Sequence, residues 1–416
     1  MSALFRSFVA RVVTRGTLEV ETASGRRFTV GNGAGDPVGV RLVDQAAERR
    51  LLLDPALALG ELYMEERIVV TRGSLYDLLA LVASNLSWQS PPGLGRAHER
   101  VRKTLRLLQQ RNTRRRAARN VGHHYDLDGR LYDLFLDADR QYSCAYFEHA
   151  DQTFEDAQLA KKRHIAAKLL LEEGHRVLDI GCGWGGLALY LAQHCRARVM
   201  GITLSKEQLA IARHRAFESG ISRTDFRLQD YRAVTEQFDR IVSVGMFEHV
   251  GVGYYDSYFA KAAQLLADDG VMLLHSIGRM DGPGSANPWM DRYIFPGSYA
   301  PALSEVLPAI ERAGLVVTDI EILRLHYAET LRAWREHFLT RRNEAKALYD
   351  ERFCRMWEFY LAGSEAAFRC SGLMVFQIQL AKSLNAVPLT RDYIAVREAK
   401  LRAKDIHHPG LMIAAE

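Results

Sequence analysis

The apolar and polar positions of the chain change their rhythm near residue 175. Beyond that point, short apolar runs alternate with longer stretches of helical spacing, such as residues 186–195 and 206–220. The apolar runs are predicted strands and cover residues 176–180, 197–203, 225–230, 240–245 and 271–278. This alternation predicts a parallel sheet with helices on both faces. Two later runs, 315–325 and 372–382, are expected to form an antiparallel pair at the sheet edge.

The first 95 residues follow a different pattern. Residues 17–31 alternate apolar and polar positions around an Ala-Ser-Gly turn, which predicts a β-hairpin. A third strand is expected at 38–44, and helices are expected at 54–66, with Asp54 as N-cap, and at 74–84. The breaker-rich stretch 90–95 predicts a boundary, so residues 1–95 are expected to form a small α+β accessory domain.

A basic segment follows this boundary, and most of its charge is arginine. Residues 96–119 include the run KTLRLLQQRNTRRRAAR, in which Leu105, Leu107 and Leu108 lie among the arginines. We expect a linker helix over residues 96–120 that is either solvated or docks on anionic phospholipid. The remaining residues, 121–416, are expected to form the catalytic domain.

Length and composition limit the possible classes without selecting one. The 416 residues suit two domains, and 48% hydrophobic and 25% charged residues are typical of globular proteins. The net charge of +5 permits an anionic partner, either a nucleic acid or a membrane surface. No apolar run is long enough to span a bilayer, so contact with lipid would be peripheral, from the water side.

The cysteines favour a reducing compartment. There are five, an odd number, and none is part of a CxxC pair, so neither a disulfide framework nor a zinc site is indicated. Arg6 and Arg11 interrupt the apolar N-terminal stretch, which makes it a poor secretory signal. We therefore expect a cytoplasmic protein.

The sharpest local motif is VLDIGCGWGG, residues 177–186. A buried strand leads into a glycine-rich turn and then a helix, and Gly181, Gly183 and Gly185 remove side chains where backbone must approach a ligand. Together with Asp179, this run resembles motif I of Rossmann-like methyltransferases, which bind S-adenosylmethionine (SAM). The next strand ends in GITLSKEQ, 201–208, with no carboxylate for the ribose, so neutral hydrogen bonds are expected there.

Several further motifs resemble one family, the cyclopropane-fatty-acyl-phospholipid synthases and mycolic acid cyclopropane synthases. They occur in family order and cover roughly residues 120–416; they are HYDL (124–127), YSCAYF (142–147), GITLSKEQ (201–208), GMFEHVG (245–251), LLHSIG (273–278), YIFPG (293–297) and LHYAETLRAW (325–334). The early segment LALGELYMEERI, 57–68, is similar to the family's accessory domain, more loosely. The resemblance implies a class I methyltransferase fold with a mostly parallel seven-stranded sheet.

The resemblance also implies the chemistry. A methyl group is transferred from SAM to a cis alkene, and a carbocation then loses a proton to a bound bicarbonate ion as the ring closes. The implied bicarbonate ligands are Cys144, Glu248, His275 and Tyr327, with the backbone of Ile277. Cys, His and Tyr donate hydrogen bonds and Glu accepts, while Glu248 is also expected to orient His275. Glu248 and His275 are expected at the ends of the fourth and fifth strands, which border the ligand crevice.

The same matching implies the contacts to SAM, with a flat ring beside the adenine. These residues are Tyr142, Ser143, Asp179, Gly181, Gly183, Thr203, Leu204, Ser205, Gln208, Asp230, Tyr231 and Val244. Four aromatic side chains either face the positive centre by cation–π attraction or belong to the core: Tyr142, Tyr146, Phe147 and Tyr327.

The substrate expected from the resemblance is an unsaturated phospholipid acyl chain at an anionic membrane surface, and residues 290–307 are expected to cover it. The accessory domain favours phospholipid over a carrier-bound chain as the substrate. A homodimer is one of the oligomeric states that the sequence allows. Three alternatives remain: methylation that gives methylene- or methyl-branched chains, a small-molecule or nucleic-acid methyltransferase, and a non-catalytic lipid-binding protein. Nucleic acid is not expected, because the basic segment lacks interleaved aromatic residues.

Overall fold

The computed structural model describes residues 2–86, 104, 110 and 128–407. Two compact units make up the chain, and both are discontinuous in sequence. The first comprises residues 1–109, 284–296 and 331–373, and the second comprises 110–283, 297–330 and 374–416. The predicted boundary at 90–95 and motif 124–127 lie outside the described residues, as does the basic segment 96–119 apart from Thr104 and Gln110. The linker helix and its membrane role therefore stay predictions.

The sheet of the first unit confirms the predicted hairpin and third strand. Its four strands have the order β2-β1-β3-β4 and are β1 (Thr17–Glu21), β2 (Arg27–Gly31), β3 (Val38–Leu42) and β4 (Ile68–Arg72). β1 pairs antiparallel with β2 and parallel with β3, while β3 pairs antiparallel with β4. Leu18, Val20 and Val30 are buried, as the alternation of the hairpin requires.

The helices of the first unit come from three stretches of the chain. They are α1 (Ser2–Val12), α2 (Gln45–Leu53), α3 (Pro55–Met64), α4 (Leu75–Leu86), α12 (Pro288–Tyr293), α15 (Arg342–Leu348), α16 (Glu351–Cys370) and all but the first turn of α14 (His326–Thr340). The predicted helices 54–66 and 74–84 correspond to α3 and α4. Asp54 precedes α3 but makes no side-chain cap hydrogen bond.

Specific contacts explain why residues 284–296 and 331–373 belong to this unit instead of to one continuous domain from 121 to 416. A Cβ atom built on Gly60 of α3 would lie 2.4 Å from Nε1 of Trp289, so only glycine permits this approach. The Tyr63 hydroxyl donates to Glu358 over 2.8 Å. Leu79 of α4 packs with Ala362 and Ala366 of α16, which cover an apolar face that residues 1–95 leave open.

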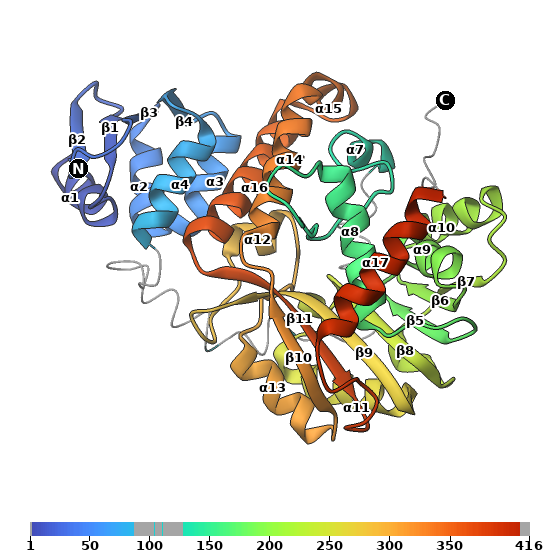
Figure 1. Ribbon diagram of the computed structural model, residues 1–416. Coiled ribbons are helices and arrows are strands. Elements are labelled where there is room, and N and C mark those ends of the chain that lie inside the picture. Colours follow the sequence, from blue (N-terminus) through green and yellow to red (C-terminus); the bar gives the residue numbers. More distant parts are fainter. Residues whose placement is uncertain (1, 87–103, 105–109, 111–127, 408–416) are drawn as a thin grey trace. The chain divides into compact units, whose positions relative to one another are not determined.

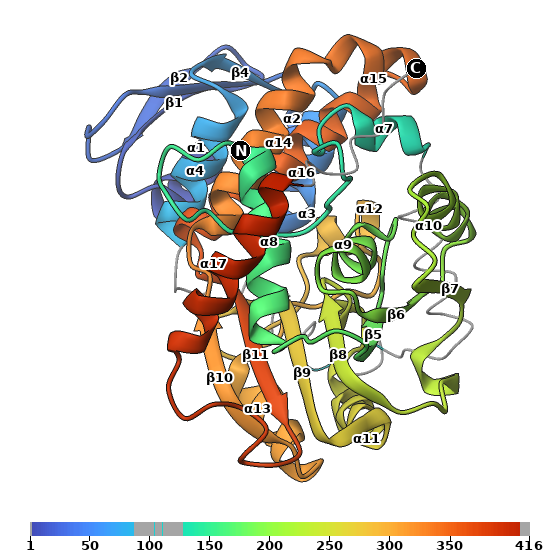
Figure 2. The ribbon, with the colours of Figure 1, turned by 45° about the vertical axis from the view of Figure 1, so that its right-hand side comes forward.

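The second unit confirms the predicted parallel sheet. Its seven strands have the order β10-β11-β9-β8-β5-β6-β7, as Figure 2 shows. They are β5 (Arg176–Ile180), β6 (Arg198–Thr203), β7 (Thr224–Leu228), β8 (Phe238–Val244), β9 (Leu266–Arg279), β10 (Val316–Ile322) and β11 (Leu373–Ala381). The strands from β9 to β7 pair in parallel. β10 and β11 form the expected antiparallel pair, with β10 at the edge.

Alternate residues of the central strands point to opposite faces of the sheet and belong to two separate hydrophobic cores. Val177, Val199, Val242 and Leu273 pack on one face with α8 (Phe154–Lys168), α9 (Gly186–His194), α10 (Lys206–Glu218) and α17 (Asp392–His407). Leu178, Met200, Ile241 and Met272 pack on the other face with α11 (Tyr255–Leu265) and α13 (Leu303–Arg312), the pair beneath the sheet in Figure 1. The sheet is thus covered by helices on both faces, as the alternation of strands and helices in the sequence predicts.

Short elements complete the second unit. They are α7 (Gly129–Asp133) and the 3₁₀ turns η1 (Tyr231–Ala233), η2 (Phe247–His249) and η3 (Val252–Tyr254). Among the residues described for both units, no helix combines the length and the hydropathy needed to cross a bilayer.

Candidate active site

The glycine-rich turn lies between β5 and α9, at the carboxyl edge of the parallel strands. Gly181, Gly183 and Gly185 all have positive φ angles, of 85°, 54° and 84°. A Cβ atom on Gly181 would lie 2.9 Å from the Cβ of Met246, so the turn abuts the loop after β8. A Cβ atom on Gly183 would meet nothing within 4 Å. The turn is therefore packed against the next loop at Gly181 and open at Gly183.

Asp179 lies two residues before this turn, inside the sheet. Its side chain is 2% exposed, and its Oδ2 atom has no hydrogen-bond partner in the part of the chain that the structure describes. Burial raises the pKa of Asp179 to about 7. A buried carboxyl group without a cation beside the open turn fits a ligand that carries positive charge.

The end of β6 forms a buried polar cluster. The Thr203 hydroxyl donates to Oε1 of Gln208 over 2.8 Å, and the Ser205 amide donates to the Thr203 hydroxyl over 3.2 Å. The Ser205 hydroxyl accepts from the backbone amide of Gln208 and caps α10. These residues gather as expected, but part of their hydrogen-bonding capacity already holds the start of the helix.

Asp230 and Tyr231, after the end of β7, were expected to contact SAM beside its adenine, but Asp230 already has a charged partner. The carboxylate of Asp230 forms an ion pair with Arg232 at 2.6 Å and accepts from its backbone amide at 2.9 Å. Tyr231 is buried, and its ring meets Tyr258 edge-on at 5.3 Å. Both residues lie directly after the strand, yet Asp230 is an already neutralised carboxylate, so any contact with an adenine would be secondary to its ion pair.

Glu248 and Ile277 contact each other directly. Glu248 lies in η2, and its Oε1 atom accepts from the backbone amide of Ile277 over 2.7 Å. Its Oε2 atom is buried and has no partner among the described residues. Burial raises the pKa of Glu248 to about 7, although the hydrogen bond from Ile277 opposes the shift. This acid is thus held in place by the Ile277 amide, and the Ser276 hydroxyl also opposes the rise in its pKa.

His275 is next to this acid along the sheet edge. It pairs with Val244, the last residue of β8, and its carbonyl accepts from Gly245 over 3.0 Å. The expectation that His275 ends its strand is wrong, because β9 continues to Arg279, and the His275 side chain is buried. Burial lowers the pKa of His275 to about 3, so the ring is neutral.

The partner of the His275 ring also differs from the expectation. Glu248 was expected to orient the ring, but Gln377 of β11 contacts Nδ1 of His275 over 3.2 Å. Glu248 instead accepts from the backbone of Ile277. The antiparallel strand β11 lies next to β9, and a residue 102 positions away in sequence thereby reaches the ring.

Cys144 lies in a segment that docks on the first turn of α14. The Ala145 amide donates to the Thr330 hydroxyl, and the Phe147 amide donates to Nδ1 of His326, each over 3.0 Å. Tyr327 is one helical turn before Thr330 and therefore on the same face of α14. Cys144 and Tyr327 are both buried. Burial raises the pKa of the Cys144 thiol well above its usual range, so it stays protonated, and the thiol donates to the Ala145 carbonyl over 3.2 Å.

A buried lysine at this site has no counterpart in the sequence predictions. Lys161 of α8 is 1% exposed and donates to Gln141 over 2.7 Å and to the Ser143 hydroxyl over 2.8 Å. Burial lowers the pKa of Lys161 to about 8. Its positive charge lowers the pKa of both Cys144 and His275. Lys161 therefore connects the segment of Cys144 with the strand of His275.

The aromatic residues divide between packing and the site. The ring of Tyr146 stacks on His164 at 4.1 Å and on His326 at 5.1 Å between centroids, so this side chain serves packing. Tyr142 packs edge-on against Tyr132 at 5.5 Å, next to the tryptophan of the glycine-rich turn, because Tyr132 also lies 4.8 Å from Trp184.

Comparison with known proteins identifies the family. Residues 112–378 match the model of a family described as mycolic acid cyclopropane synthetase. This chain belongs to that family. It is 38% identical to the cyclopropane-fatty-acyl-phospholipid synthase of Escherichia coli K12 over 352 residues, which are 84% of this chain and 89% of that one.

Two further relatives extend the comparison. The tuberculostearic acid methyltransferase UfaA1 of Mycobacterium tuberculosis is 36% identical over 376 residues, 84% of this chain and 85% of that one. The crystal structure of the mycolic acid cyclopropane synthase CmaA1 complexed with SAH and CTAB is similar, with a TM-score of 0.60 and 35% identity, over 63% of this chain and 97% of that one. The protein is therefore a SAM-dependent methyltransferase of the family that modifies lipid acyl chains.

Proposed function

We propose that this enzyme transfers a methylene unit from SAM to the cis double bond of an unsaturated phospholipid acyl chain and forms a cyclopropane ring. The observation that carries the proposal is the buried carboxyl group of Glu248, which has one oxygen without a partner and accepts from the backbone of Ile277, two residues after the neutral His275. A site that must lead a proton away from a hydrocarbon needs such a polar group where water is excluded.

The residues around the glycine-rich turn fit SAM, which supplies the electrophilic methyl group. Asp179 is a buried carboxyl group with an oxygen lacking a partner, and it complements the positive charge of the ligand. Gly183 leaves open space where a ligand can approach the backbone. The polar cluster of Thr203 and Gln208 offers neutral hydrogen bonds, with the remaining proposed contacts from Tyr142, Ser143, Gly181, Leu204, Ser205, Asp230, Tyr231 and Val244.

The donor set also fits a bicarbonate ion, which when bound supplies a base for the proton that ring closure releases. Cys144, His275 and Tyr327 would hold it, with Glu248 as the fourth side chain and Ile277 nearby. Burial keeps the thiol protonated and the imidazole neutral. Because the pKa of Glu248 is about 7, this carboxyl retains its proton part of the time and does not simply repel an anion. The charge of Lys161 behind the site favours an anion further.

The proposed substrate is taken from the name of a relative that is similar over most of this chain. The Escherichia coli relative, which is similar over 84% of this chain, carries phospholipid in its name. We propose that the enzyme binds an anionic membrane surface peripherally, on its cytoplasmic side, as a monomer or a homodimer.

A second candidate product has support from a specific relative. The tuberculostearic acid methyltransferase UfaA1 is nearly as similar over the same share of this chain, and its name denotes methylation of a fatty acid. Both outcomes pass through the same methyl transfer: a methylene branch results from loss of a different proton, and a saturated methyl branch also requires a two-electron reductant. Membership in the family favours an acyl chain over a nucleic acid or a small molecule in either case.

Transfer of a labelled methyl group tests the proposal. The purified chain is incubated with methyl-labelled SAM and vesicles of anionic phospholipid that carry cis-monounsaturated chains, while vesicles of saturated phospholipid are the matched control. We expect label in the lipid fraction with unsaturated vesicles only. Equal labelling of both vesicles, or no label in lipid, would refute an alkene as the acceptor.

A further inference from the structure

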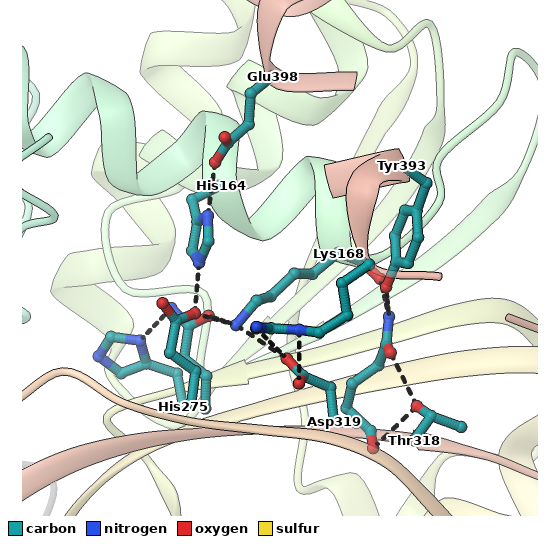
Figure 3. Close-up of polar contacts among 11 residues, drawn as sticks. His164, Lys168, His275, Thr318, Asp319, Tyr393 and Glu398 are labelled. Carbon is teal, nitrogen blue, oxygen red and sulfur yellow. Dashed lines mark hydrogen bonds and ion pairs between the residues drawn. The ribbon is translucent and has the colours of Figure 1, made fainter. Parts of the chain in front are cut away.

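A chain of buried and half-buried polar side chains leads from α17 through α8 to His275. Nδ1 of His164 contacts Glu398 at 2.5 Å, and Nε2 of His164 contacts Glu321 at 2.7 Å. Figure 3 shows His164 below Glu398, with Lys168 and His275 further along the same chain of contacts. Lys168 forms an ion pair with Glu321 and donates to Oε1 of Gln377 over 3.0 Å, and the amide nitrogen of Gln377 then meets His275.

The orientation of the Gln377 amide follows from the chemistry of its two neighbours. An ammonium group has donors only, so the atom of Gln377 that faces Lys168 must be the oxygen. The Nε2 atom consequently faces His275, and an amide NH₂ group is itself a donor only. A flipped amide would set donor against donor at Lys168 in a site where Gln377 and Lys168 are each 0% exposed.

Lys168 is itself held firmly. Its ammonium group contacts Glu321 and lies 3.5 Å from Asp319, both on the edge strand β10. These carboxylates compensate a charge that would otherwise be costly to bury. Lys168 therefore forms a stable anchor for the amide oxygen.

We propose that Gln377 is a positioning residue that holds His275 as its Nε2–H tautomer, with Nδ1 as the acceptor for the Gln377 amide and the Nε2–H left as a donor for the reaction site. The role of that donor in the reaction rests on the proposed function, but the assignment of the tautomer does not. The charged groups that face His275 are Lys161 and Lys168, with His164 and Glu321 further along. The nearby cations oppose protonation of the ring, as burial does, so the neutral tautomer persists.

The tautomer determines what His275 can do. A ring whose Nδ1 accepts from Gln377 and whose Nε2 carries the proton is a hydrogen-bond donor toward an anion and has no free nitrogen to take up a proton. His275 thus acts by holding an anion and not as the base. The base must then be another group, as the proposed bicarbonate site requires.

Nitrogen NMR of the full chain labelled with ¹⁵N-histidine tests the tautomer directly. The His275 signals are assigned by their loss in His275→Asn. In the wild type we expect an unprotonated Nδ1 and a protonated Nε2. Gln377→Glu presents a carboxylate that can only accept, so the proton should move to Nδ1. A proton on Nδ1 in the wild type, or an unchanged tautomer in Gln377→Glu, would overturn the proposal.

Two further variants keep the test interpretable. Gln377→Met removes the partner of Nδ1 and should give a mixture of tautomers; a ring that stays purely Nε2–H in this variant also contradicts the role of Gln377. Gln379→Met is the matched control, because Gln379 is a buried amide on the same strand that bonds Tyr393 and the Lys168 carbonyl. It should leave the His275 signals unchanged, and a shift of the tautomer in this control as large as in Gln377→Met would argue against a specific effect.

Activity provides the second readout. Loss of a group that orients a functional histidine typically costs about 10- to 100-fold, so kcat of Gln377→Glu should fall by that amount while the Kd for SAM is unchanged. If the wild type shows the Nε2–H tautomer but transfers no methyl group to lipid, the proposed function fails and the positioning role stands. If the tautomer moves in Gln377→Glu and kcat does not, the tautomer has no role in the reaction.

Discussion

The affinity for SAM should depend on pH through Asp179. The pKa of this carboxyl group is about 7 in the free protein because it is buried without a cation. A ligand with positive charge favours the ionised form, so binding should lower the pKa of Asp179 and release a proton. About one in ten Asp179 carboxyls is ionised at pH 6 and about nine in ten at pH 8, so this residue should tighten binding up to about tenfold across that range.

Isothermal titration calorimetry of the wild type and Asp179→Asn measures this effect. The asparagine lacks the charge, and loss of a charged hydrogen bond costs about 1.5–3 kcal/mol, or roughly 10- to 150-fold in Kd at pH 8. The ratio of the variant's Kd to the wild-type Kd cancels the ionisation of the ligand's own amino group, and it should rise from pH 6 to pH 8.

The matched control is Asp239→Asn. Asp239 lies at the opposite end of the sheet, near the start of β8, where it accepts from the Arg176 amide. It should bind SAM as the wild type does at every pH. A constant ratio for Asp179→Asn between pH 6 and pH 8, or wild-type affinity in that variant, would refute the reasoning about the buried charge.

Substitutions at three places, Glu248, the glycine-rich turn and Lys168, have expected outcomes. Glu248→Gln keeps an acceptor for Ile277 but loses the acid, so kcat for lipid methylation should fall by about 100-fold or more while calorimetry gives an unchanged Kd for SAM; wild-type turnover would contradict the site. Gly183→Ala should cost about 1 kcal/mol in urea unfolding because of its positive φ, yet abolish SAM binding. Gly185→Ala should cost more, since its Cβ would lie 2.8 Å from Phe226; equal stability of the two variants would contradict this packing. Lys168→Met removes one of two basic partners from both Glu321 and Asp319, which keep His164 and Arg391, and should lower the free energy of unfolding by about 1–3 kcal/mol, whereas an unchanged urea midpoint would mean that the Lys168 ion pairs contribute nothing.

The sheet was predictable because each central strand is an apolar run bounded by breakers. Residues 177–180, 199–203, 240–243 and 270–276 are buried on both faces, and such strands leave a clear signal in sequence. The hairpin of the first unit was equally clear from its alternation. β4, by contrast, begins four residues after α3 and buries only its first residue, so its pattern predicts little by itself.

The division into units was less predictable because it depends on contacts between distant segments. The hydrogen bond from Tyr63 to Glu358 joins residues 295 positions apart, and no local pattern carries that information. The fit of Trp289 against Gly60 is of the same kind. A domain boundary read from breakers marks where a chain can separate, but not which later segments return to the first unit.

The site residues were predictable as far as motifs carry them, whereas their buried partners were not. Glu248 and Ile277 come from two of the predicted motifs, although their direct contact was not predicted, while Gln377 and Lys161 belong to no motif. Helix α8 mixes charged and apolar residues without a stripe, a pattern typical of an exposed helix, yet Lys161 and Lys168 are buried. Their burial depends on partners from other strands and loops, such as Glu321, 153 residues from Lys168.

The central claim is that the methyl carbon of SAM becomes the ring carbon of a cyclopropane in a phospholipid chain. The most direct measurement is ¹³C NMR of lipid recovered after reaction with SAM that carries ¹³C in its methyl group. We predict that the label appears as a methylene carbon within a three-membered ring. Label found as an exocyclic methylene or a branched methyl group, or found nowhere in the lipid, would contradict the account.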